Sequence, residues 1–69
     1  MADVVLVNPG NKKPAVIKVI QRITKVSLIS AKQLVENTPS IVVSGVSFME
    51  AQEYRNALEV AGAQVRVKE

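Results

Sequence analysis

The chain has 69 residues, contains neither cysteine nor histidine, and carries a formal net charge of +3. This length fits one small domain, and the missing residue types exclude disulfides, a thiolate nucleophile and histidine-based acid–base chemistry. Apolar residues make up 48% of the chain and only Phe48 and Tyr54 are aromatic, which indicates a globular protein with an aliphatic core.

The charges are unevenly distributed along the chain. No acidic residue stands between Asp3 and Glu36, whereas this interval contains six cations. These cations are Lys12, Lys13, Lys18, Arg22, Lys25 and Lys32. Such a surface favours an acidic partner, which would be a protein, RNA or a membrane surface. The simpler alternative is a solvated polar face, and the charge pattern leaves both open.

The first predicted elements are a strand and a helix. The β-branched run DVVLV at residues 3–7 predicts a buried strand, and the NPGN that follows is a strong turn signal. A helix over residues 13–24 comes next, because Pro14 suits its first turn and apolar residues recur at i, i+3, i+4 and i+7. These core-facing residues are Val16, Val19, Ile20 and Ile23. Ile17 falls between this stripe and the cations on the opposite face.

A second helix is predicted over about residues 28–37. Ser27 can cap its first turn, and Pro39 ends it because proline disfavours helical geometry at the residue before it. The predicted buried stripe consists of Leu28, Ala31 and Val35, with Leu34 at its flank. Ile29 and Lys32 are expected to project to the side.

A strand and a third helix follow. SIVVSG at residues 40–45 is too short and too β-branched for a helix and predicts a strand. Ser47 and Glu50 have the spacing of a capping box, which predicts a helix that runs to about Ala61. Gly62 then suits the left-handed conformation that ends a helix. The residues that this helix is expected to bury are Ala51, Tyr54 and Leu58.

The last predicted element is a strand at residues 63–68, whose alternation directs Val65 and Val67 inward. The order β-α-α-β-α-β predicts an α+β fold, with three helices packed on one face of a three-stranded, mainly antiparallel sheet. Residues 1–69 are expected to form a single domain. No apolar run approaches about 18 residues and no signal segment is evident, so we expect no membrane span and a cytoplasmic location.

The reactive groups that an enzyme needs are not brought together by this pattern. Glu50 has a capping role, and the other acids form neither a catalytic pair nor a cluster for a hard cation. The NPGNKKP segment lacks the spacing of a phosphate-binding loop. We therefore expect no enzyme activity, no cofactor, no metal and no small-molecule substrate.

RNA binding is an alternative that the cations leave open. The acid-free segment could neutralise several phosphates, but it contains no aromatic side chain to stack on bases. Any binding to nucleic acid would be weak, driven by the phosphate backbone and sensitive to salt.

Several stretches of the chain resemble one known family. KKPAVIKVIQRIT, AKQLVENTP, GVS and ALEVAGAQVRVK are together similar to the C-terminal domain of the bacterial ribosomal stalk protein, and the similarity spans residues 3–68. The resemblance implies that the first strand lies between the other two. It also implies a ribosomal protein of translation, which recruits and helps activate GTPases such as elongation factors Tu and G through the first two helices.

The resemblance also implies a set of contact residues. Ala15, Ile17 and Lys18 match the family's contact surface directly. Lys13 matches the family's lysine at the start of the first helix, and Lys32 is retained in the motif AK-x-LVE. An apolar side chain with flanking lysines has the chemistry to bind an acidic partner helix.

Three positions complete the predicted partner-binding site and depart from the family. Pro14 stands where the family has valine, and Gln21 stands at its next cation position, with Arg22 one place later and about 100° around the helix. The complete predicted set is Lys13, Pro14, Ala15, Ile17, Lys18, Gln21, Arg22 and Lys32.

Other departures concern the loop, the charge and the start of the chain. The family's loop between the first two helices is rich in glycine, whereas this chain has Arg22, Lys25 and Ser27 there, and the chain is basic where the family is commonly acidic. The similarity begins two residues after Met1, so we expect neither the dimerisation domain nor the hinge of the family. A stand-alone adaptor of the same fold with a different protein partner stays an alternative.

Overall fold

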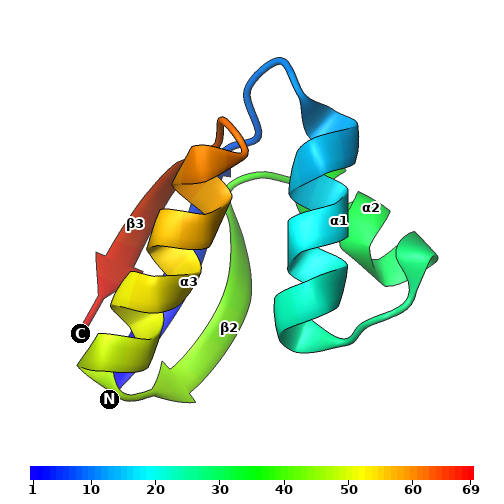
Figure 1. Cartoon of the computed structure of the whole chain (residues 1–69). Helices are drawn as coiled ribbons and strands as arrows, with labels where there is room; N and C mark the ends of the chain where they lie inside the picture. Colours follow the sequence, from blue (N-terminus) through cyan, green and yellow to red (C-terminus); the bar gives the residue numbers. More distant parts are fainter.

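The computed structural model describes residues 1–69 and confirms the predicted element order (Figure 1). The strands are β1 (Ala2–Asn8), β2 (Ser40–Val46) and β3 (Gln64–Lys68), and the helices are α1 (Lys13–Thr24), α2 (Leu28–Glu36) and α3 (Phe48–Val60). Each predicted end lies within one residue of the observed end. The α+β fold class is therefore confirmed.

The sheet places β1 between β2 and β3, and both pairings are antiparallel. This order agrees with the central first strand that the resemblance implied. Leu6 pairs with Val65 and Val4 pairs with Val67, so the inward side chains of neighbouring strands lie opposite each other. The pairing of β1 with β2 contains register shifts on either side of Val4.

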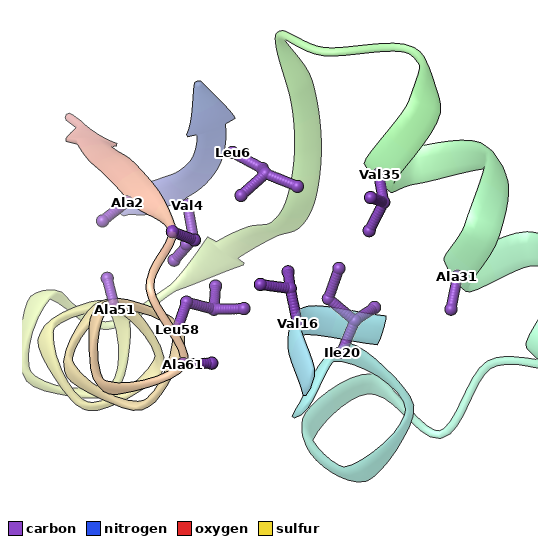
Figure 2. Packing of buried hydrophobic residues seen from close by; sticks show 11 residues of the cluster. Ala2, Val4, Leu6, Val16, Ile20, Ala31, Val35, Ala51, Leu58 and Ala61 are labelled. Carbon is purple, nitrogen blue, oxygen red and sulfur yellow. The ribbon is translucent and has the colours of Figure 1, made fainter. Parts of the chain in front are cut away.

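The core is a single cluster of eleven buried residues, all of them aliphatic. Its members are Ala2, Val4, Leu6, Val16, Ile20, Ala31, Val35, Ala51, Leu58, Ala61 and Ala63. Figure 2 shows that side chains from β1, α1, α2 and α3 are directed toward the same interior. Because each large aliphatic side chain contributes about 1.5–3 kcal/mol when buried, these few residues hold the helices on the sheet.

Two expectations about burial need correction. Leu28 was expected in the buried stripe of α2, but this residue is 49% exposed. The physical reason is its place as the first residue of α2, since Ala31 and Val35, farther along the helix, are the ones that reach the core. Tyr54 was expected to be buried by α3, but it packs on the core and is only half-buried. Val65 and Val67 of β3 face the core as predicted.

Local hydrogen bonds set the helix ends as the sequence predicted. The hydroxyl of Ser47 accepts from the backbone N–H of Glu50 at 3.1 Å, and the Glu50 carboxylate accepts from the Ser47 N–H at 3.4 Å, which completes the capping box of α3. Ser27 caps α2 in the same way through the N–H of Ser30 at 3.2 Å. Gly62 has a φ of +100°, as the expected left-handed turn after α3 requires.

The turn before α1 packs closely against the turn after α3. Gly10 has a φ of +74°, and its N–H donates to the side-chain oxygen of Asn8 at 2.7 Å. A Cβ atom at Gly10 would overlap the carbonyl oxygen of Gly62. The NPGN turn therefore fixes where α1 begins relative to the sheet.

Candidate functional site

The eight residues of the predicted partner-binding site all lie on α1 and α2. Seven belong to α1, and Lys32 belongs to α2. The two helices pack against each other and are joined by residues 25–27 alone (Figure 1). Because α2 contacts α1, β1 and β2 but neither α3 nor β3, the two helices present a surface at one side of the molecule. We call it the α1–α2 surface.

The predicted residues differ in how far they reach into solvent. Lys13, Pro14, Lys18, Arg22 and Lys32 are exposed. The other three, Ala15, Ile17 and Gln21, are half-buried, and the first two of them pack against the core cluster.

Ile17 occupies the intermediate position that the helical periodicity predicted. Its neighbour Val16 is fully buried and its other neighbour, Lys18, is exposed. Part of the Ile17 side chain contacts the core and part of it faces solvent. A partner can therefore cover apolar area at Ile17 without the core having to open.

None of the six cations of the acid-free segment forms an ion pair within the domain. The only ion pair of the structure joins Arg55 Nε and Glu59 Oε1 on α3, at 4.0 Å. The cations of α1 and α2 consequently keep their full electrostatic attraction for an outside group.

The α1–α2 loop holds a lysine in a backbone conformation that favours glycine. Lys25 has φ 59° and ψ 29°, and its N–H donates to the carbonyl oxygen of Gln21 at 2.8 Å, which ends α1. A left-handed conformation costs a residue other than glycine about 1–2 kcal/mol. The loop thus follows a path suited to glycine, although a charged residue stands in it.

Two residues that the sequence prediction left out of the site are prominent on the α1–α2 surface. These residues are Leu28 and Ile29, which are 49% and 70% exposed. Ile29 stands one turn before Lys32 on the side of α2 away from the core. The sequence carried a signal for Ile29, because its spacing lies outside the apolar stripe of this helix. It carried none for Leu28, whose spacing matched the core stripe.

Other regions of the molecule show fewer features of a binding site. No group of three or more acidic, histidine or cysteine residues is placed to hold a metal. A shallow cavity of about 480 Å³ lies on the face of the sheet that the helices leave open, and Val5, Ile41 and Arg66 are among its lining residues. None of the helices combines the length and the apolar character that crossing a bilayer requires.

Comparison with known proteins gives a consistent result. The family model described as "Ribosomal protein L7/L12 C-terminal domain" matches residues 2–68. The large ribosomal subunit protein bL12 of a Nitratiruptor species is 47% identical over 66 residues, which cover 96% of this chain and 52% of the relative. The proteins of the same name from Geobacillus stearothermophilus and Campylobacter lari are 47% and 48% identical, with 54% and 53% of their lengths covered. The chain therefore spans about half the length of the curated relatives it matches.

Proposed function

The chain belongs to the ribosomal protein L7/L12 C-terminal domain family, and on this premise we propose that it is a non-enzymatic module that binds translation GTPases through α1 and α2. Its partners are elongation factors Tu and G, and its place of action is the ribosome, in the cytoplasm. The relatives that match it are named large ribosomal subunit proteins, which supports a role at the ribosome.

One observation carries the proposal. The α1–α2 surface combines a half-buried apolar side chain, Ile17, with exposed cations that have no partner within the domain. Apolar area at the centre of an interface supplies affinity, and surrounding charges guide an acidic partner into position. Lys13, Lys18 and Lys32 are the cations of this surface that also match the family's contact residues.

The proposal is tested by titrating the domain with purified elongation factors Tu and G. We expect Ile17→Ala to weaken binding by at least about fivefold, because the variant removes apolar contact area. Lys18→Glu should weaken binding by a similar factor or more, because a repelling charge then faces the acidic partner. Isothermal titration calorimetry measures the dissociation constants, and circular dichroism verifies that the variants stay folded.

Two controls match these substitutions. Arg66→Glu makes the same change of charge on β3, on the other side of the molecule, and Val60→Ala shortens an apolar side chain that is 89% exposed on α3. Neither control should change the affinity by more than about twofold. If the parent domain binds a factor and both Ile17→Ala and Lys18→Glu bind it equally well, the site is wrong.

The test also separates this function from its alternative. An adaptor of the same fold for another protein would present the same surface, but it would bind neither elongation factor. If the parent domain binds neither factor at concentrations up to roughly 1 mM, the proposed function is excluded.

A further inference from the structure

The two free edges of the sheet differ in regularity. Because β1 lies in the middle, β2 and β3 each leave one edge without a neighbouring strand. The pairing of β1 with β2 contains two register shifts, whereas its pairing with β3 is regular from Asp3 to Leu6. Bulges distort a strand and make its free edge a poorer template for another strand. β3 is therefore the edge that is better suited to accept a further strand.

The outer edge of β3 has unpaired backbone groups. β3 contacts only β1 and α3, and Figure 1 shows it at the margin of the sheet. No side chain bonds to the backbone of residues 64–68, and no backbone hydrogen bond from a turn or cap reaches them. The N–H and C=O groups that point away from β1 are thus free to bond to another strand.

The side chains of β3 alternate between two kinds. Val65 and Val67 pack against the core, yet both are only half-buried. Arg66 and Lys68 are exposed and line the shallow cavity on the open face of the sheet. A strand added beside β3 would place its own side chains on these same two faces, with Cβ atoms about 4.5–5.5 Å from those of β3.

The cations of β3 have no partner within the domain. Neither Arg66 nor Lys68 takes part in an ion pair. Asp3 stands opposite Lys68 on β1, but its carboxylate accepts from the N–H of Gly45 on β2 at 3.1 Å. β3 itself contains no acidic residue. An acidic side chain on an added strand would therefore lie beside two positive charges that nothing in the domain compensates.

We propose that the outer edge of β3 is a binding site for an extended acidic segment of a partner protein, in which acidic and apolar residues alternate. The segment adds a fourth strand to the sheet through backbone hydrogen bonds. Its acidic residues lie beside Arg66 and Lys68 on the open face, and its apolar residues extend the cover of Val65 and Val67 on the face of the core. The site is separate from the α1–α2 surface, so the proposal does not depend on the proposed function.

Charge distinguishes this occupant from a second copy of the chain. Two β3 strands paired antiparallel would bring Arg66 and Lys68 of both copies onto one face, where like charges opposite each other destabilise the pair. A basic segment would be repelled for the same reason. Charged side chains protect an edge strand from self-association, and the same cations make an acidic strand the complementary partner.

The probe is the acetylated and amidated heptapeptide EVEVEVE, titrated into the isotope-labelled domain at roughly 100 mM salt, where charges more than about 10 Å apart are largely screened. We expect a dissociation constant below roughly 1 mM, and changes in the amide NMR shifts that centre on residues 64–68.

Three matched peptides separate the contributions to binding. KVKVKVK reverses the charge, ESESESE removes the apolar side chains, and EVEPEVE removes a central backbone donor. KVKVKVK and EVEPEVE should not bind at concentrations up to roughly 1 mM. ESESESE should bind at least about threefold more weakly than EVEVEVE, because its serines cover little apolar area.

Variants of the domain test the cations. Arg66→Gln changes an exposed residue, so the fold should be preserved, and affinity for EVEVEVE should fall by about two- to fivefold because an opposite-charge cross-strand pair is lost. Arg66→Lys keeps the charge and should retain most of the affinity. Lys32→Gln is the matched control, since it lowers the net charge equally on α2 and should change the affinity by less than about twofold.

Each result supports the site or overturns it. Shifts at β3, no binding by EVEPEVE and weaker binding by Arg66→Gln support it. Equal binding of EVEVEVE and EVEPEVE would exclude strand addition, and absence of binding up to roughly 1 mM would overturn the site. Shifts confined to α1 and α2, with weaker binding by Lys32→Gln, would assign the peptide to the cations of the other surface. A domain that sediments as a dimer and shows no β3 shifts with the peptide would assign this edge to a second copy.

Discussion

At the scale of single residues, left-handed backbone conformations occur at four positions for different reasons. Gly45 and Gly62 leave open space where a Cβ atom would stand, so their glycines are required by the backbone angle alone. At Gly10 the backbone angle and a close approach to the Gly62 carbonyl both exclude a side chain. Lys25 adopts the same conformation with a side chain, at a cost of about 1–2 kcal/mol relative to glycine.

Gly10→Ala should therefore destabilise the domain more than Gly45→Ala. Both variants force alanine to a positive φ, +74° and +69°, at a cost of about 1–2 kcal/mol. Only the first also pushes a methyl group into a backbone oxygen, which moves the NPGN turn away from the α3–β3 turn. Urea unfolding measures the difference. Equal free energies of unfolding for the two variants would contradict the close approach.

At the scale of elements, the helices are bounded by local hydrogen bonds that the sequence encodes directly. The capping box of α3 satisfies donors at both Ser47 and Glu50, whereas α2 has only the hydroxyl of Ser27. α1 begins without a side-chain cap and has proline in its first turn. The three helices therefore begin with different capping arrangements, although all three pack on the same core.

Ser47→Ala should cost the domain about 1 kcal/mol, within a range of about 0.5–2 kcal/mol for lost helix caps. The variant removes the oxygen that accepts from the Glu50 N–H at 3.1 Å. Ser44→Ala is the control, because Ser44 is an exposed serine of β2 that takes no part in a cap. Thermal and urea unfolding provide the free energies. An equal effect of the two substitutions would show that the cap does not stabilise α3.

At the scale of the whole molecule, the charges and the core are segregated. The interior is entirely aliphatic, and no polar or charged residue is buried. The six cations between residues 12 and 32 lie on or beside the two helices at one side of the sheet, while α3 carries the Arg55–Glu59 pair. A partner that docked on the α1–α2 surface, as we propose, would change the charge balance of one side and leave the core in place.

Binding of the domain to an elongation factor should be salt-sensitive and should exceed its binding to structureless RNA. Raising the salt concentration from roughly 50 mM to roughly 200 mM should lower both affinities, because both depend on the lysines. The apolar contribution of Ile17 should keep the affinity for the protein higher at either salt concentration. Fluorescence anisotropy with labelled domain measures both. Tighter binding to RNA, with a steep slope of log affinity on log salt, would favour the RNA alternative.

The sequence by itself determined the elements, their ends and the fold class. Periodicity, capping residues and turn residues act over a few neighbours in the chain, so the helix at residues 13–24 and the Ser47–Glu50 capping box follow from local sequence alone. The same local periodicity placed Ile17 between the core stripe and the cations. The predicted contact residues came from family resemblance.

Only the tertiary structure decided how deeply each apolar residue lies. Leu28 has core spacing but stands where α2 has not yet reached the sheet, so it is exposed, whereas Ala31 one turn later is fully buried. Val65 and Val67 point inward but remain half-buried, because β3 is an edge strand. Burial depends on which elements from elsewhere in the chain cover a residue. The spacing of apolar residues along a helix does not show which of them those elements cover.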